Sequence, residues 1–352
     1  MLFLGFFLCT GYTCGSDWRE YEMVYEECDD EFPWFRLVVM EPFYLFLTFT
    51  LNHLGIGFWP FFIVTKLVLF WKIVSMIKRF CNNSYILFAF TFYLGFWGIN
   101  HFIDPPFRNM IAAFFFMCSI DSILEKNFKK YCIWIFIATM FHYSTILFLP
   151  AYFFFTRQFS NKVLIWTFVG INILFISPER IFSVIASLFD FIPYVHGKVG
   201  FYGTESDNVY GTGKVISVAY LMHCIIFFLL LKYRKHITNS REGLLLFQFS
   251  IFFVFIFRIG LSAVIFSRFQ LFVACFYCIT IANILYVMRK KYKKTFMFFI
   301  YLMSILAVYK TSQRPIMDPY TNYFLEYNSG MTYDQRSDYN FKYSKFKIKE
   351  ND

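Results

Sequence analysis

Several long, uninterrupted apolar runs are the feature that most constrains this chain. The clearest of them lie at 84–100, 108–124, 214–231 and 243–266. A run of roughly 18 or more apolar residues is typical of a membrane-spanning helix, which must cross about 30 Å of hydrocarbon. The low charged fraction, 16%, excludes an ordinary soluble domain, in which about 25% of residues are charged. The sequence therefore predicts an all-α, polytopic integral membrane protein.

Basic residues gather in short clusters between the apolar runs. These clusters lie at 78–79, 125–130, 232–242 and 289–294. Such clusters mark cytoplasmic loops under the positive-inside rule, and because they are not joined in one basic face they exclude nucleic acid as a partner. With these clusters in the cytoplasm, the outer loops are expected at about 16–41, 101–107 and 179–213.

The chain is expected to form one transmembrane domain over 1–310, followed by a polar C-terminal tail over 311–352 on the outer side. The domain would hold roughly 10–12 helices. If every apolar run crossed the membrane once, some loops would not lie on the side that the basic clusters predict. The conflict disappears if 42–56 and part of 131–155 form short or re-entrant helices. Because such broken segments are tolerated only where they line a protein cavity, these two regions are the expected surroundings of a site.

Three arginines are placed where lipid should exclude charge. Arg108 opens the run 108–124 at its outer edge, Arg258 lies in the middle of FVFIFRIGLS, and Arg268 lies at an outer turn. A charge within a bilayer costs several kcal/mol unless it faces a cavity or a partner, and guanidinium binds phosphate groups bidentately. These arginines are therefore candidate anion ligands, although Arg108 and Arg268 could instead be anchors at the interface.

Among the other polar residues, His142 is the main candidate for proton transfer, because it lies in the expected broken segment and imidazole titrates near neutral pH. The alternative is a hydrogen-bonded packing histidine. Most of the nine cysteines lie in apolar runs and resemble small hydrophobic residues, whereas Cys14 and Cys28 flank the first outer loop and could pair. No ATP, nicotinamide or zinc motif occurs, so neither a cofactor nor a metal is expected.

Six short motifs follow one another in order along the chain. They are GSDWREYEMVYEE (15–27), EPFYLFLTFTLNHLGIGF (41–58), PPFRNMIAAFFF (105–116), FHYSTILFLPAYFFF (141–155), SRFQLF (267–272) and DPYTNYF (318–324). Together they resemble the EpsG-type branch of the Wzy polymerases, which join oligosaccharide repeat units of O-antigen, capsule and exopolysaccharide. One element departs from the family pattern, since no Arg precedes Gly15 by about four residues. Either the start is trimmed or Arg19 substitutes for it.

The resemblance implies a reaction and a location. A glycan on undecaprenyl pyrophosphate would be transferred to the next lipid-linked repeat unit, without nucleotide sugar or metal. The enzyme would span the bacterial cytoplasmic (inner) membrane with its active site facing the periplasm, and a chain-length regulator and a flippase are candidate partners. The expected roles fall to these residues: Arg108, Arg258 and Arg268 for pyrophosphate, His142 with Asp17 for the acceptor hydroxyl, and Arg19, Tyr21 and Tyr320 for weaker sugar contacts.

Other functions stay open from the sequence. A lipid-linked glycan flippase or transporter would need coupling carboxylates within the membrane, and Asp121 is the one acidic residue well inside a predicted span. A membrane acyltransferase acting on surface sugars would need a reactive side chain that faces the cytoplasm. A ligase or another lipid-linked glycosyltransferase, and a structural partner in a polysaccharide assembly complex, are the remaining alternatives.

Overall fold

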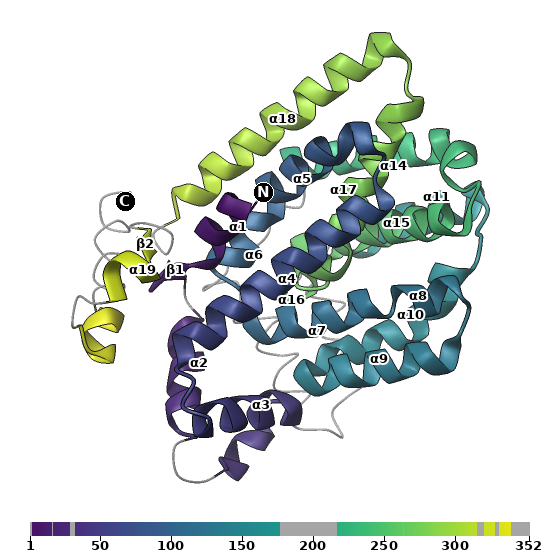
Figure 1. Cartoon of the computed structure of the whole chain (residues 1–352). Helices are drawn as coiled ribbons and strands as arrows, with labels where there is room; N and C mark the ends of the chain where they lie inside the picture. Colours follow the sequence, from purple (N-terminus) through teal and green to yellow (C-terminus); the bar gives the residue numbers. More distant parts are fainter. Residues whose placement is uncertain are drawn as a thin grey trace. The chain divides into compact units, whose positions relative to one another are not determined.

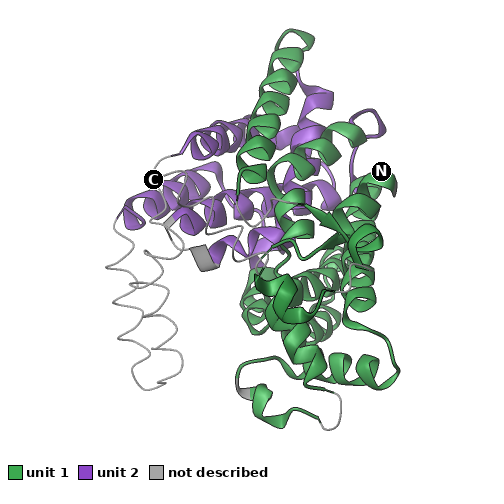
Figure 2. Ribbon diagram, turned by 90° about the vertical axis from the view of Figure 1, so that its left-hand side faces the viewer, with its two compact units in different colours: residues 1–79, 86–152, 289–352 green, residues 80–85, 153–288 purple. Residues whose placement is uncertain are grey.

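The computed structural model describes residues 2–15, 17–28, 32–176, 217–262, 264–314, 320–327 and 331–338. Helices account for nearly all of the regular structure in these ranges, which confirms the predicted all-α class. The chain divides into two compact units, coloured separately in Figure 2. Unit 1 consists of residues 1–79, 86–152 and 289–352, and unit 2 of residues 80–85 and 153–288. The outer loop expected at 179–213 lies outside the described residues.

Six helical segments of the described ranges are long and apolar enough to cross a membrane. They are Phe58–Phe80, Asn83–Ile103, Phe107–Leu124, Arg241–Leu261, Gln270–Val287 and Lys290–Ser312. On the first of them, Val64, Val68 and Trp71 recur every three or four residues and are exposed. A stripe of large exposed apolar side chains at helical spacing is typical of a lipid-facing surface, so the polytopic membrane class is confirmed.

Unit 1 is built from both ends of the chain and a central run of helices. Its elements are α1 (Leu2–Cys9), β1 (Gly11–Tyr12), α2 (Trp18–Glu26), η1 (Trp34–Val38), α3 (Pro42–His53), α4 (Phe58–Phe80), α5 (Ile86–Tyr93), η3 (Leu94–Gly98), α6 (Ile99–Ile103), α7 (Phe107–Cys118), α8 (Ile120–Leu124), α9 (Phe128–Phe141), η4 (Tyr143–Leu147), α18 (Lys290–Ser312), β2 (Thr321–Asn322) and α19 (Tyr323–Glu326). The helix α10 (Phe148–Thr156) follows η4 and runs on into unit 2.

The core of unit 1 lies around α7. Phe107 at its start is fully buried, and its ring lies 4.6 Å from that of Phe62 on α4 and 5.4 Å from that of Tyr21 on α2. The helix α9 packs along α7 and also contacts α3. This arrangement brings the start of α3, the start of α7 and the end of α9 into one neighbourhood.

Two segments of unit 1 are shorter than a membrane span. The helix α3 begins with Pro42, whose fixed φ suits the first turn, and its 12 residues extend only about 18 Å. The stretch predicted at 131–155 is broken, because α9 ends at Phe141 and His142 adopts an extended backbone (φ −158°, ψ 107°) before η4 begins. The prediction of a short 42–56 helix and a broken 131–155 segment is therefore confirmed.

The span Asn83–Ile103 contains a π-helical turn, η3, that the apolar pattern did not indicate. Gly95 in this turn faces Ser304 of α18, and a Cβ added to Gly95 would lie only 2.5 Å from the Cβ of Ser304. The absence of a side chain at Gly95 therefore allows α18 to pack against η3. Because a π-turn holds one more residue than an α-helical turn, it changes the direction in which the side chains after Gly98 point.

The two ends of the chain are joined in a short antiparallel ladder. Gly11 pairs with Asn322 and Tyr12 with Thr321, and Figure 1 shows β1 beside β2 near α19. The ring of Tyr320 stacks on Phe7 of α1 at 4.6 Å between centroids. Because hydrogen-bonded strands lie at one depth, residues 11–12 and 321–322 lie on the same side of the membrane. The outer position of the tail beyond 311 stays a prediction.

Unit 2 is a separate helical bundle. Its elements are η2 (Asn83–Tyr85), α11 (Asn161–Leu174), α14 (Val218–Ile237), α15 (Arg241–Ser262), α16 (Val264–Ser267) and α17 (Gln270–Val287). The helix α17 is buried along nearly its whole length, as expected of a core helix that is apolar on every side. The helix α11 has only 14 residues, fewer than the roughly 20 that a membrane span needs.

Candidate active site

One buried carboxylate joins three elements of unit 1. Glu41, directly before α3, is only 3% exposed. Its Oε2 accepts a hydrogen bond from Nη1 of Arg108 at 2.5 Å, and its Oε1 lies 3.2 Å from Nδ1 of His142. The backbone N–H of Tyr143 donates to the same Oε1 at 3.1 Å. We call Glu41, Arg108 and His142 the Glu–His–Arg cluster.

The electrostatics of the cluster fix the roles of its atoms. Burial alone would raise the pKa of Glu41, but the hydrogen bond from His142 and the charge of Arg108 outweigh it and lower that pKa below its ordinary value. An ionised carboxylate only accepts hydrogen bonds, so Nδ1 of His142 must carry the proton that it shares with Glu41. In the neutral imidazole, Nε2 then bears the free electron pair and can accept a proton.

Two tyrosines lie beside the cluster. The guanidinium of Arg108 lies 6.0 Å from the centre of the Tyr21 ring, and Tyr21 lies 5.8 Å from Tyr44 of α3. Burial raises the pKa of Tyr21, although the charge of Arg108 opposes that shift. Nε of Arg108 is buried and has no hydrogen-bond partner among the described residues. The cluster thus combines a proton acceptor with a cation that retains donor capacity.

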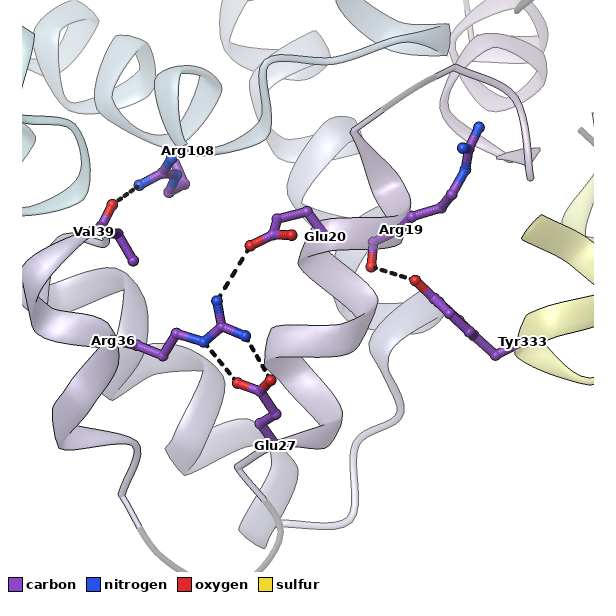
Figure 3. Close-up of polar contacts among 7 residues, drawn as sticks. All are labelled: Arg19, Glu20, Glu27, Arg36, Val39, Arg108 and Tyr333. Atoms are coloured by element: carbon purple, nitrogen blue, oxygen red, sulfur yellow. Dashed lines mark hydrogen bonds and ion pairs between the residues drawn. The ribbon is translucent and has the colours of Figure 1, made fainter. Parts of the chain in front are cut away.

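The other residues expected at the site from the first half of the chain lie along α2. Asp17 precedes this helix and its carbonyl accepts the Tyr21 N–H at 3.3 Å. Figure 3 shows Arg108 near Val39 on one side of α2 and Arg19 near Tyr333 on another, with Arg36 bridging Glu20 and Glu27 between them. The carboxylate that contacts His142 is Glu41, and the catalytic role of Asp17 stays a prediction.

Tyr320 and the cysteines have structural contacts in unit 1. The hydroxyl of Tyr320 donates to the carbonyl of Phe7, so this side chain holds the C-terminal segment to α1. Cys14 and Cys28 are both buried, and they have different neighbours: Cys14 contacts Thr321, and Cys28 contacts Val24 and Thr48. The disulfide considered from their spacing is absent.

The remaining two arginines belong to unit 2. Arg258 is 2% exposed, and its guanidinium donates to Oδ1 of Asn172 at 3.1 Å and to the carbonyl of Phe175 at 2.6 Å. It lines an apolar pocket of about 300 Å³ with Tyr220. Arg268 is exposed in the turn between α16 and α17. Since Arg108 belongs to unit 1, the meeting of the three arginines at one pyrophosphate stays a prediction.

Two buried carboxylates that the sequence analysis did not single out make several polar contacts in unit 1. Glu41 was visible only as the acidic residue of the E-P motif, which by itself marks a helix start. A second buried carboxylate, Glu22 of α2, accepts from Nε1 of Trp59 at 2.9 Å and from Nη2 of Arg336 at 2.7 Å. Burial raises the pKa of Glu22 despite these contacts. The pairing of Glu22 with Arg336 left no signal in the sequence, because Arg336 lies in a polar tail 314 residues away.

Asp121 does not behave as an isolated membrane carboxylate. It lies in α8, about half exposed, and pairs with Arg79 at 2.5 Å. This ion pair disfavours the flippase alternative, in which Asp121 would couple ion movement at mid-membrane. Within the described ranges, no group of three or more His, Cys, Asp or Glu side chains is arranged to hold a metal ion.

The fold and the cluster define a polytopic, all-α membrane protein in which a buried carboxylate contacts a histidine and an arginine. The chain matches the model of the EpsG family over residues 1–329, and it belongs to that family. Membership in this family, together with the six apolar helices, assigns it to the membrane glycan polymerases of the Wzy type. No curated protein and no solved structure shows significant similarity to the chain.

Proposed function

We propose that the protein transfers a growing undecaprenyl-pyrophosphate-linked glycan onto the next lipid-linked repeat unit at the outer face of the cytoplasmic membrane. The observation that carries this proposal is the Glu–His–Arg cluster, in which Glu41 contacts both His142, the proposed general base, and the cation of Arg108. The EpsG family supplies the kind of reaction, the joining of repeat units. Nothing in the proposed reaction requires a metal or a cofactor.

In the proposed reaction, a hydroxyl oxygen of the acceptor sugar attacks the anomeric carbon of the donor. The new C–O bond forms as the bond from that carbon to the pyrophosphate oxygen breaks, and its electron pair leaves with the lipid pyrophosphate. Nε2 of His142 takes the hydroxyl proton, while Glu41 holds the imidazole and stabilises its charged form. Arg108 offsets the negative charge that develops on the leaving group.

Arg258 and Arg268 are proposed as further ligands of the pyrophosphate. The support for Arg258 is its burial within an apolar span beside an apolar pocket, a combination that suits a lipid chain and its charged head. Arg268 is supported by its place in a turn at the end of a candidate span. A flippase that delivers the lipid-linked unit and a regulator of chain length are the proposed partners.

A strain that lacks this protein provides the direct test. Gel analysis of its surface glycan should show a band of a single repeat unit, because the unit is still made and exported but not extended. Reintroducing the gene should restore the ladder. An unmodified full ladder would contradict the proposal and favour acyl transfer, and the absence of any lipid-linked unit outside would favour a flippase.

Replacing Glu41 by Gln is expected to slow transfer by at least about 10²-fold, because an amide orients the imidazole poorly and does not stabilise its charge. The lowered pKa keeps Glu41 ionised even below the ordinary carboxyl range, so its stabilising effect is lost only as the pH falls through that lowered value. The Gln variant has no carboxyl group that can be protonated in this range, so its residual rate should lack the loss that the wild type shows there.

The readout for Glu41→Gln is the pH profile of the transfer rate, with Glu20→Gln as the matched control. Glu20 is an exposed carboxylate on α2 whose contact to Arg36 is long, at 3.5 Å. Its variant should keep both the rate and the profile of the wild type. An acid limb that does not move in Glu41→Gln would show that Glu41 serves folding and does not position His142.

A further inference from the structure

A second polar cleft lies in unit 1, apart from the Glu–His–Arg cluster. It has a volume of about 460 Å³, within the range of roughly 300–1,000 Å³ that is typical of small-molecule sites. Its walls come from α2, the turn between α3 and α4, and the C-terminal segment. The residues that matter for its chemistry are Glu22, Tyr25, Trp59, Tyr327, Tyr333 and Arg336. None of Glu41, Arg108 and His142 lines it.

Glu22 is the polar centre of this cleft. Its carboxylate is 4% exposed, and Oε1 is held by both Trp59 and Arg336. Its Oε2 is buried and has no hydrogen-bond partner among the described residues. A buried charged oxygen without a partner carries a desolvation cost, which a ligand hydroxyl that donates to it would remove through a charge-assisted hydrogen bond.

The rest of the lining distinguishes among ligand classes. Glu22 and Glu26 supply two carboxylates, whereas the cation of the cleft, Arg336, is already paired with Glu22. This balance disfavours pyrophosphate, and the carboxylates disfavour a polyprenyl chain. Tyr327, which is 53% exposed, offers an aromatic face, and Tyr333 is a second tyrosine of the lining. Aromatic faces with hydrogen-bonding groups suit a ring that is apolar on its faces and hydroxylated at its edge.

We infer that this cleft is a sugar-binding subsite, which holds one or two uncharged sugar rings of the glycan with a hydroxyl donated to Oε2 of Glu22 and a ring face on Tyr327. The two clusters share the helix α2, where Tyr21 faces Arg108 and the next residue, Glu22, faces the cleft. The inference rests on the proposed function for the kind of ligand, but its site is separate. Because the C-terminal segment supplies Tyr327, Tyr333 and Arg336, the subsite is complete only when the two ends of the chain are joined.

Titration calorimetry on the full-length protein in detergent tests this inference. The probe is the repeat-unit oligosaccharide released by mild acid from the surface polysaccharide of cells that carry the protein. We expect saturable binding by the wild type and by His142→Ala, and at least tenfold weaker binding by Glu22→Gln and Tyr327→Ala. Glu20→Gln, on the same helix but facing Arg36, should bind as the wild type does.

A variant that fills the cleft tests the inference even if the Glu22→Gln protein does not fold. Gly57 lines the cleft, and a Cβ built on it would meet only Pro60, at 3.7 Å, so Gly57→Leu should fold normally and block the probe. The inference would be overturned if the wild type did not bind the probe, or if Gly57→Leu and Tyr327→Ala bound it as the wild type does. Displacement of the probe by inorganic pyrophosphate would also overturn it. Since binding is measured without transfer, a failed polymerase assay would leave this result standing.

Discussion

Replacing Arg108 by Ala is expected to abolish long-chain polymer while the single lipid-linked unit remains. The guanidinium is the cation of the Glu–His–Arg cluster, and removal of one preorganised donor to a developing anion typically costs about 10²–10³ in rate. Gel analysis of the surface glycan, together with extraction of the lipid-linked pool, would show both effects. Long polymer of normal length in these cells would end the assignment of Arg108 to pyrophosphate.

The control for this prediction must account for Glu41. Loss of Arg108 leaves a buried carboxylate without its cation, which typically costs about 3–5 kcal/mol, so the amount of membrane-inserted protein has to be measured as well. Arg108→Lys keeps a positive charge near Glu41 but loses the planar fork, and it should give normal protein with much shorter polymer. Arg79→Ala, which breaks an exposed pair with Asp121, should leave the ladder unchanged.

Replacing His142 by Ala is expected to lower the rate of transfer by about 10²–10⁴-fold, the usual contribution of a positioned general base. Binding of the lipid-linked donor should change little, because the cation of the cluster is retained. Single-turnover transfer by purified protein, measured beside donor binding, separates these two quantities.

A second histidine provides the comparison for His142→Ala. His53 lies at the end of α3 and is exposed, and its ring contacts the carbonyl and the ring of Phe49. His53→Ala should transfer at the wild-type rate. If His142→Ala instead loses protein level and activity in parallel, His142 is a packing residue and the base must be sought elsewhere.

The parts of this fold that the sequence predicts are those that depend on segment length and on charge placement. The apolar runs identify the long spans because a bilayer demands about 20 apolar residues in sequence. The clusters of Lys and Arg then show that 42–56 and 131–155 cannot both be full spans, and α3 and the break at His142 agree. The π-helical turn at Leu94–Gly98 was missed, since one extra residue in a turn leaves composition and length almost unchanged.

The site was predicted only in part, because its contacts join residues that are far apart in the chain. His142 was singled out by its place in a broken segment, and Arg108 by its place at the edge of a span. Glu41 was missed as their partner: directly before Pro42 it suggests a helix cap, but its side chain makes no cap and reaches residues 67 and 101 positions away. Arg336 was likewise hidden in a polar tail, whose composition alone suggests solvated residues.

The ladder between β1 and β2 also sets the order in which this protein can mature. Tyr12 and Thr321 are hydrogen-bonded across 309 positions, so the strand at 11–12 stays unpaired until the ribosome has made residues 321–322. Closing so long a loop is entropically costly and slow compared with local helix formation. A premature stop codon after α18 would therefore yield a product with every candidate spanning helix described here that nonetheless lacks the wall formed by Tyr327, Tyr333 and Arg336. Membrane insertion and competence to hold the glycan would then be lost by different mutations.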